Sequence, residues 1–356
     1  MADRKNYGDN RWIIVYGNYE NMEKLAVNEL YKIINANVPY VLTVYNDSIS
    51  EDKLKESNIA FVGKTSTNKY LKKFANEKLF VPNTKNEGFI IKTMTSPFNE
   101  NRKISILCGN DDNGVLYAVH DFHHYYVEME KYNHFNTVYN KQYKVFVSEM
   151  HDFELSSSPS FPYRGIWTWG HTIYDYKRYL DNMSKLKLNL LTLWNDFVPI
   201  NAKDLVDYAH SLGIKVVWGY SWCWGEEVNP NDPSELDKWS KRIIDVYEKE
   251  YMPLNIDGMY FQTFTEHSGE KIGGKSTAEL AADWVNKISE LILKKHPDLW
   301  IQFGLHATYI KKDYDAIAKV DNRLTIVWED GGAFPFHHDP KNIKDESETC
   351  EFTSKI

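Results

Sequence analysis

The chain has 356 residues, 42% of them hydrophobic and 26% charged, which is ordinary for a globular protein large enough for two domains. The formal net charge of -8 leaves no basic surplus to displace counterions from phosphates, so the composition excludes an electrostatic nucleic-acid binder. Three scattered cysteines and the lack of a long apolar run predict no disulfide framework, no signal peptide and no membrane span, and we expect a cytoplasmic protein.

Residues 1–155 mix strand and helix patterns and predict a first domain of the α/β class. A serine- and proline-rich stretch, Ser156–Pro162, follows it and is the strongest linker signal in the chain. We therefore expect a second domain over residues 160–356. The elements expected in the first domain are strands at Trp12–Tyr16, Val41–Val44, Phe89–Lys92 and Ile104–Cys108, a helix over Glu20–Ile34, and a helix that begins near Gly114.

In the second domain, strand patterns alternate with helical patterns of roughly ten to fifteen residues, which indicates βα units and a parallel sheet. The stretch Gly269–Thr277 (GEKIGGKST) does not match the spacing of a phosphate-binding loop, and we expect a mobile loop there. The expected strands are Arg164–Trp169, Asn189–Trp194, Ile214–Tyr220, Gly258–Thr265, Trp300–Leu305 and Leu324–Trp328. The expected helices are one through Tyr176, Leu180 and Met183, and then Ala202–Leu212, Ser234–Glu250, Thr277–Lys295 and Lys311–Val320.

Polar or aromatic residues follow the end of every expected strand of the second domain. A doubly wound sheet concentrates its ligand-binding groups at one switch point, whereas a barrel spreads them over the carboxyl ends of all strands. The pattern therefore predicts a TIM (β/α)8-type barrel. Because we find about six βα units where such a barrel has eight, and the tail after Pro340 has no strand pattern, we expect a truncated barrel.

The fourth expected strand runs into a polar cluster within DGMYFQTFTEHSGE, Asp257–Glu270. Side chains alternate along a strand, so Tyr260, Gln262 and Glu266 share one face, which we expect to point into the barrel mouth. Glycoside hydrolysis requires a carboxylic acid that protonates the departing oxygen, and Glu266 is the candidate for that role. The alternative is a structural glutamate paired with an arginine or a lysine.

A second carboxylate is needed as a base or nucleophile. Glu329 and Asp330 follow the sixth expected strand, and because adjacent residues point to opposite sides, we expect one of the two to face the mouth. The alternative is that both cap the loop before Gly331 and Gly332. Asp196 is a third candidate, and we expect it to support the site or to accept a hydrogen bond from a substrate hydroxyl.

Aromatic residues make up 15% of the chain, with 11 tryptophans, and they serve either a large core or a surface that stacks on sugar rings. We expect Trp167 and Trp218 in the core. Histidines at the strand ends lack the HExxH spacing or any comparable one, so no metal and no cofactor are expected. The residues expected to bind substrate are Trp169, Trp194, Trp222, Trp224, Trp328, His171, His267, His306, Asn195, Asp196 and Gln262.

The stretch GNDDNGVLYAVHDF, followed by FPYRGIW, resembles exo-acting glycoside hydrolases that carry a hexosaminidase-like α/β domain before a catalytic barrel. These include the family 20 and family 84 hexosaminidases and the family 67 α-glucuronidases. Family 20 places an Asp-Glu pair at the end of the fourth strand, whereas Thr265 precedes Glu266 here. Family 67 places a lone Glu there, in a segment similar to FQTFTEHSG, after a stretch similar to Asn229–Trp239. The resemblance implies that Glu266 is the acid and that the base lies near Glu329 or Asp330.

The leading hypothesis is an α-glucuronidase-like exo-glycosidase that trims short oligosaccharides during polysaccharide degradation. Its partner would be the oligosaccharide substrate, with no nucleic acid and no membrane. The alternative within the same class is a β-N-acetylhexosaminidase-like enzyme. The alternative from a different class is a barrel that binds carbohydrate without turnover.

Overall fold

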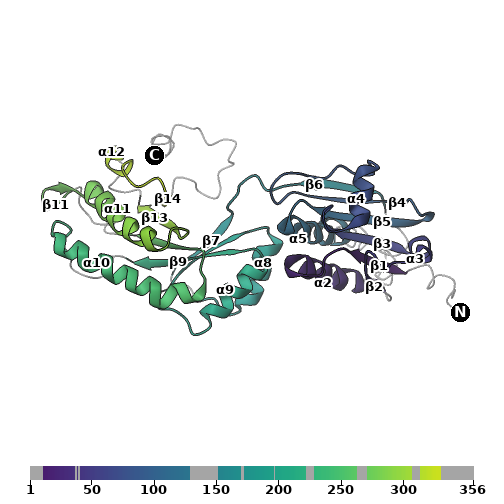
Figure 1. Ribbon diagram of the computed structural model, residues 1–356, viewed down its shortest axis with the longest axis horizontal. Helices are drawn as coiled ribbons and strands as arrows, with labels where there is room; N and C mark the ends of the chain where they lie inside the picture. The colour runs from purple at the N-terminus through teal and green to yellow at the C-terminus, as the bar shows by residue number, and fades with distance from the viewer. Residues whose placement is uncertain are drawn as a thin grey trace, which may run out of the picture. The chain divides into compact units, whose positions relative to one another are not determined.

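The computed structural model describes residues 11–36, 38, 41–128, 151–169, 172–195, 197–221, 228–262, 271–306 and 313–329. The chain divides between Arg164 and Gly165 into two compact units, called unit 1 and unit 2 below (Figure 1). The division falls just after the stretch predicted to be a linker. Unit 1 comprises Met1–Arg164, Asp181–Leu188 and Ser211–Gly213, and unit 2 comprises Gly165–Leu180, Asn189–His210 and Ile214–Ile356.

Unit 1 is built on a six-stranded mixed sheet. Its strands are β1 (Trp12–Tyr16), β2 (Val41–Tyr45), β3 (Asn58–Gly63), β4 (Phe89–Ser96), β5 (Asn99–Gly109) and β6 (Phe153–Ser157). They lie in the spatial order β2-β1-β3-β5-β4-β6. Strands β2, β1, β3 and β5 run parallel to one another, while β4 pairs antiparallel with both β5 and β6.

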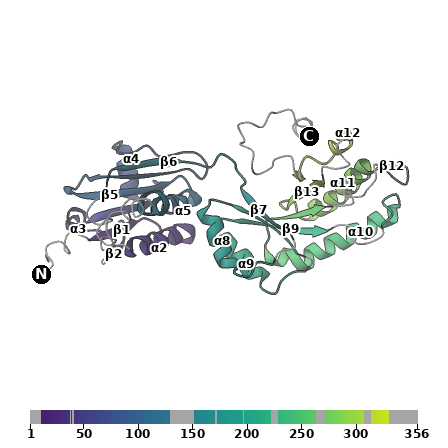
Figure 2. The same ribbon diagram turned by 180° about the vertical axis from the view of Figure 1, so that it is seen from behind.

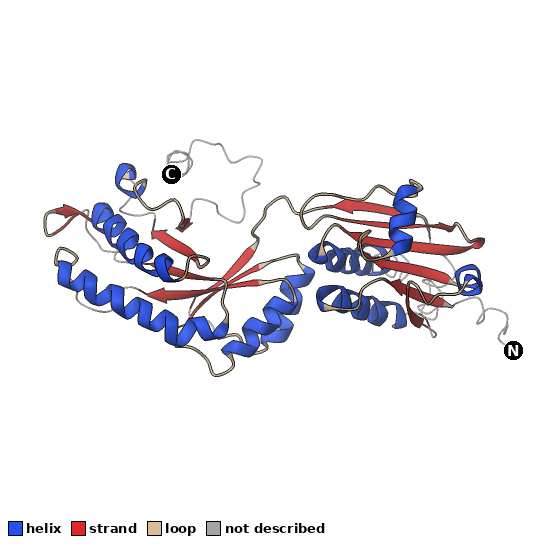
Figure 3. Ribbon diagram, viewed as in Figure 1, coloured by secondary structure: helices blue, strands red, loops and turns tan. Residues whose placement is uncertain are grey.

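Helices cover both faces of this sheet (Figure 3). They are α2 (Asn21–Asn35), α3 (Glu51–Glu56), α4 (Lys69–Asn76) and α5 (Asp112–Asp121), and α5 continues into a π-helical segment over Phe122–Glu128. One core lies under α2 and α5 and contains Ile14 and Leu30. The other lies under α3 and α4 and contains Phe61 and Leu71. Because both faces are covered, every residue of the central strand β3 is buried.

Unit 1 differs from the sequence prediction at four elements. Strand β3 and helices α3 and α4 were not predicted, although Asn68 supplies a helix-start signal for α4 by accepting hydrogen bonds from the N–H groups of Tyr70 and Leu71. Strand β6 was not predicted either, and it includes Ser156 and Ser157, which the linker prediction had claimed. Pairing with β4 holds these serines in an extended conformation, so the serine-rich composition wrongly predicted a linker at these two residues.

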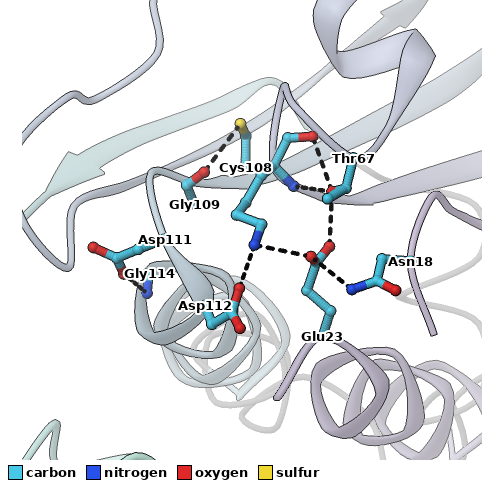
Figure 4. Close-up of polar contacts among 9 residues, drawn as sticks. Asn18, Glu23, Thr67, Cys108, Gly109, Asp111, Asp112 and Gly114 are labelled. Carbon is cyan, nitrogen blue, oxygen red and sulfur yellow. Dashed lines mark hydrogen bonds and ion pairs between the residues drawn. The ribbon is translucent and has the colours of Figure 1, made fainter. Parts of the chain in front are cut away.

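A polar network joins the carboxyl ends of three parallel strands in unit 1 (Figure 4). The Glu23 carboxylate, on the first turn of α2, is almost fully buried and accepts hydrogen bonds from Thr67 at 2.9 Å and Asn18 at 3.2 Å. Lys64, directly after β3, forms ion pairs with Glu23 at 3.2 Å and with Asp112. Burial opposes the charge on Lys64, but the two carboxylates outweigh it and raise the lysine pKa. The network therefore ties together the loops that follow β1, β3 and β5.

The Cys108 thiol lies beside this network (Figure 4). It is buried and donates a long hydrogen bond to the Gly109 carbonyl, with 3.8 Å between sulfur and oxygen. Burial raises the pKa of the thiol to about 12. Cys108 therefore stays protonated at neutral pH and does not serve as a nucleophile.

Unit 2 contains a curled sheet in which all six strands run parallel (Figure 3). The strands are β7 (Gly165–Trp169), β8 (Leu190–Trp194), β9 (Lys215–Ser221), β10 (Gly258–Gln262), β13 (Trp300–His306) and β14 (Thr325–Glu329). They lie in the order β14-β13-β10-β9-β8-β7, so β14 and β7 are the two edges of the sheet within the described part of the chain. This half-barrel confirms the prediction of a TIM-type sheet with about six units.

The helices of unit 2 lie along the outer side of the curled sheet (Figures 1 and 2). They are α8 (Tyr176–Lys185), α9 (Ala202–Ser211), α10 (Pro233–Val246), α11 (Thr277–Lys295) and α12 (Tyr314–Ile317), with π- and 3-10-helical turns at Tyr247–Tyr251 and Met252–Leu254. The last half of α8, from Asp181, and the last residue of α9, Ser211, belong to unit 1. Outward-facing strand residues are buried beneath these helices. Trp218, which the sequence placed in the core, is fully buried and packs against Tyr251.

Two predictions in unit 2 need correction. The expected helix over Lys311–Val320 is described only over Tyr314–Ile317. The stretch expected to be a mobile loop contains a small hairpin of β11 (Lys271–Ile272) and β12 (Lys275–Ser276). Gly273 and Gly274, with φ of +57° and +86°, form its two-residue turn, which requires a left-handed backbone that glycine adopts without strain.

Candidate functional site

The interior face of the half-barrel carries a cluster of aromatic residues. Trp167 on β7, Trp194 on β8 and Tyr260 on β10 pack with ring centroids 5.0–6.5 Å apart. Trp194 and Tyr260 are 5% and 1% exposed, and Val217 on β9 is fully buried beside them. Trp167 thus packs in the core, as predicted. At this level the half-barrel is filled by side chains, as the interior of a TIM-type barrel is.

Two glycines make room for these rings. A Cβ atom on Gly219 would lie 2.3 Å from the Trp194 ring, and one on Gly304 would lie 1.9 Å from the Tyr260 hydroxyl oxygen. Both positions are in the middle of extended strands, where glycine marks a close approach by a neighbour. This role was not predicted from the sequence, where its one signal is a glycine inside an otherwise apolar strand.

The carboxyl ends of β13 and β14 bring two predicted site positions together. His306 ends β13 and Glu329 ends β14, and the strand register pairs these two positions. Val327 packs against the interior aromatic cluster, and positions 327 and 329 share a face because residues alternate along a strand. The carboxyl ends of the strands form one edge of the sheet, called the rim below. The backbone therefore places position 329 on the interior face at the rim, and position 328, which carries Trp328, on the other face.

Other predicted substrate-binding residues lie at the same rim. Trp169 ends β7 and pairs with Trp194. Asn195 follows Trp194 and is half-buried. Gln262, at the end of β10, is 2% exposed and shares the interior face with Tyr260. Since Trp194 is also almost completely buried, neither its ring face nor the Gln262 side chain is open to a sugar in this arrangement.

The remaining predicted site residues stay predictions. They lie outside the described residues, and they include both the proposed acid and one of the two proposed bases. These residues are Glu266, Asp330, His171, Asp196, Trp222, Trp224 and His267.

A charged cluster at the amino end of the same sheet has a structural role. Asp257 precedes β10 and accepts hydrogen bonds from His210 at 2.8 Å, the Val216 N–H at 2.8 Å and Lys215 at 3.1 Å. Burial opposes ionisation of Asp257, but these three donors outweigh it and lower the carboxyl pKa. The cluster ties β9 to β10 at the end of the sheet opposite the rim, where TIM-type barrels carry stabilising residues rather than catalytic ones.

The described residues contain neither a cluster that could hold a metal ion nor a helix that could cross a membrane. No group of three or more His, Cys, Asp or Glu side chains in the described part of the chain is arranged to hold a metal ion. Within the same residues, no helix has both the length and the apolar character needed to cross a membrane.

The fold is similar to that of solved structures from glycoside hydrolase families 84 and 20. Among solved structures it is similar to CpGH84D, with a TM-score of 0.55 and 12% identity, over 90% of this chain and 52% of that one. It is also similar to a mutant Streptomyces plicatus β-hexosaminidase in complex with the product GlcNAc, with a TM-score of 0.52 and 9% identity, over 89% and 69% of the two chains.

A third similar structure is an inactive mutant of a family 20 exo-β-N-acetylglucosaminidase from Vibrio harveyi, with a TM-score of 0.50 and 9% identity, over 90% of this chain and 54% of that one. The chain thus spans about half the length of CpGH84D and of the Vibrio enzyme. No protein-family model matches the sequence, and no curated protein matches it. At these identities the similarity establishes the fold alone.

Proposed function

We propose that the protein is a glycoside hydrolase that removes a terminal N-acetylhexosamine from an oligosaccharide. The observation that carries the proposal is the fold, which is similar over about nine-tenths of this chain to enzymes named β-hexosaminidase and exo-β-N-acetylglucosaminidase. This similarity moves the preferred substrate away from the terminal uronic acid of the leading sequence hypothesis, because none of the similar structures reported above is an α-glucuronidase.

Glu266 is the proposed general acid. It comes four residues after Gln262 in the sequence, and Gln262 ends β10 at the edge of the sheet where TIM-type barrels carry their active sites. Aromatic surroundings such as the Trp167–Trp194–Tyr260 cluster would favour the protonated carboxyl group that this role requires.

Glu329 is the better candidate for the second carboxylate, because the backbone of β14 carries position 329 on the interior face of the sheet. Thr265 stands where family 20 has its orienting acid, so we propose that Glu329 acts on water or on the sugar directly. A separation of about 6.5–9.5 Å between the two carboxyl groups would give inversion, and about 5–5.5 Å would give retention.

The proposal is tested with a disaccharide that carries a terminal N-acetylhexosamine and whose leaving group is an unactivated sugar hydroxyl that needs a proton to depart, assayed with the full chain and with Glu266→Gln. Removing a general acid costs roughly 10²–10⁴-fold in rate, so we expect kcat to fall by that factor. Glu279→Gln is the matched control, because Glu279 is an exposed residue on α11 and its loss should leave kcat unchanged. Equal release of N-acetylhexosamine from the disaccharide by the wild type and Glu266→Gln would remove Glu266 from this role.

The substrate panel separates the competing functions. Release from a terminal uronic acid but not from an N-acetylhexosaminide would restore the α-glucuronidase hypothesis. Sugar binding by both proteins, measured by calorimetry, with no release by either would favour the carbohydrate-binding barrel.

A further inference from the structure

The two edges of the unit 1 sheet are built very differently. Strand β6 forms one edge and β2 the other, and neither has a further strand beside it among the residues that the structure describes. An open edge offers unpaired N–H and C=O groups to any extended chain, so proteins usually protect such strands with charges, prolines or side-chain cover.

Strand β6 is protected in this way. Glu154 on β6 forms an ion pair with Lys92 at 2.8 Å, and Asp152 just before it pairs with Lys103 at 2.7 Å. The Ser157 carbonyl accepts a hydrogen bond from the Asn83 side chain at 2.9 Å. Charge and side-chain cover therefore discourage another strand from pairing at this edge.

Strand β2 has no such protection. Its sequence, VLTVY, contains no charged residue, proline or glycine, and consists of residues with high strand propensity. Leu42 and Tyr45 are 45% and 43% exposed, and Thr43 is exposed as well. An uncharged and exposed edge strand of this composition is a pairing surface.

A row of tyrosines extends this apolar surface at one end of β2. Tyr45 pairs in register with Tyr16 on β1, and their ring centroids are 6.0 Å apart. The Tyr16 ring in turn lies 5.1 Å from that of Tyr19, which is 43% exposed. An ion pair between Asp47 and Lys69 lies just beyond the last residue of β2, and Asp47 also forms a side-chain hydrogen bond with Tyr45. Among the described residues the nearby charge therefore lies at this end of the strand, and the residues of β2 itself carry none.

We propose that two copies of this chain pair through β2, antiparallel, about a two-fold axis at Thr43. A two-fold interface brings the same surface of each copy together, so a strand must be complementary to its own reverse. Centred on Thr43, the pairing sets Val41 opposite Tyr45 and Leu42 opposite Val44. It places aromatic beside β-branched side chains and threonine beside threonine, which are favourable cross-strand pairs, and it brings no like charges together.

This pairing also places each side chain on a consistent face. Val41 packs against the core under α2 and α5, and Tyr45 lies on the same face because it is four residues further along the strand. Val44 packs against the core under α3 and α4, and Leu42 lies on the same face of the strand as Val44. The two copies would therefore form one continuous sheet, and because a five-residue edge is short, we expect a dissociation constant on the order of 1–100 µM.

The test is sedimentation analysis of the full chain from about 1 to 300 µM, a range that spans the expected dissociation constant. We expect reversible dimerisation in the wild type. In Thr43→Lys two ammonium groups oppose each other on the axis, and the dissociation constant should rise roughly tenfold or more. The control Ser156→Lys places the same charge on the exposed β6 edge and should leave the dissociation constant unchanged.

A cross-linking measurement identifies the surface independently. Thr43→Cys brings two thiols opposite each other within reach of a disulfide, so mild oxidation should give a covalent dimer, whereas Ser156→Cys and the wild type should not. A wild type that stays monomeric over the whole concentration range overturns the proposal. So does a dimer that Thr43→Lys leaves intact and Thr43→Cys fails to cross-link, since its interface would then lie elsewhere.

Discussion

His120 is a partly buried histidine near the end of α5, and its surroundings disfavour its charged form. Burial lowers the pKa of His120 to about 4, and the nearby cations Lys185, Lys187 and His123 act in the same direction. Its ring nitrogen lies 3.2 Å from the Ser184 hydroxyl. The side chain is thus held neutral in the folded protein at a pH where it takes up a proton in the unfolded chain.

This depressed pKa predicts a loss of stability in mild acid. Between about pH 6.5 and pH 4 the unfolded chain binds one more proton than the folded chain, so the stabilisation is complete above this range and falls with pH inside it. From pH 7.5 to pH 5 the contribution of His120 amounts to about 2 kcal/mol. We expect the free energy of unfolding, measured with urea, to fall by about 2 kcal/mol less in His120→Gln than in the wild type between pH 7.5 and pH 5.

The matched control for this prediction is His124→Gln. His124 is an exposed histidine four residues further on, so its replacement controls for the loss of an imidazole ring from the same helical segment. If the His120 and His124 variants lost the same free energy between pH 7.5 and pH 5, His120 would not be the group responsible.

At the scale of secondary-structure elements, β13 can pass over the aromatic cluster only because residue 304 lacks a side chain. In Gly304→Ala the new methyl group would lie 1.9 Å from the Tyr260 hydroxyl oxygen, and Tyr260 is buried and has no room to move. Such overpacking costs about 1–3 kcal/mol and disturbs the packing of β10 and β13. We expect a lower melting temperature together with an altered near-ultraviolet circular dichroism spectrum, which reports aromatic packing.

Gly274→Ala provides the comparison. Gly274 lies in the β11–β12 turn with φ of +86° and nothing within 4 Å of its Cβ position, so alanine would strain the backbone without meeting a neighbour. We expect a loss of about 1 kcal/mol and an unchanged near-ultraviolet spectrum. Spectral changes of equal size in both variants would argue against the Tyr260 contact as the cause.

Elements with strong local patterns were predicted well from the sequence. Helix α11 runs from Thr277 to Lys295 as predicted, because its apolar positions repeat at helical spacing and Ser276 caps its start. Strand β3 was missed because its short buried run gives no periodic signal, and it becomes a strand by pairing with β1 and β5. The hairpin of β11 and β12 was missed because strands of two residues carry no pattern.

At the scale of the whole molecule, the two units carry different spectroscopic labels. Trp12 alone of the 11 tryptophans lies in unit 1, so tryptophan fluorescence follows unit 2, whereas far-ultraviolet circular dichroism follows both units. Lys64→Met removes the cation that neutralises the Glu23 carboxylate, whose side chain is 2% exposed. Leaving that charge unpaired should destabilise unit 1 by about 2–4 kcal/mol.

We therefore expect Lys64→Met to shift the unfolding transition seen by circular dichroism more than the transition seen by fluorescence. Lys69→Met is the control, because Lys69 and its partner Asp47 have side chains that are 51% and 59% exposed. An exposed ion pair contributes about 0–1 kcal/mol, so this variant should unfold almost as the wild type does. Equal shifts of the unfolding transition in both lysine variants would show that the Glu23 network stabilises unit 1 no more than an exposed ion pair does.

The candidate site was predictable from the sequence only in part. The polar residues at the ends of the strands marked the rim, because a parallel sheet gathers its carboxyl ends at one edge. The sequence left Glu329 and Asp330 as equal candidates; the structure pairs position 329 with position 306, while Asp330 lies outside the described residues and the choice between the two stays a prediction. Trp194 was predicted from the sequence to stack on a sugar ring. In the structure it packs against Trp167 and Tyr260 and is 5% exposed.

The sequence by itself determined the alternation of strands and helices, the two-part organisation and the parallel character of the second sheet, because hydrophobic periodicity is local and survives in any stretch of chain. Only the tertiary structure decided which loops meet at Glu23, which rings fill the half-barrel and which strands form the edges of each sheet. Each of these depends on strand order and on space shared by residues far apart in the sequence, and local periodicity carries no information about either.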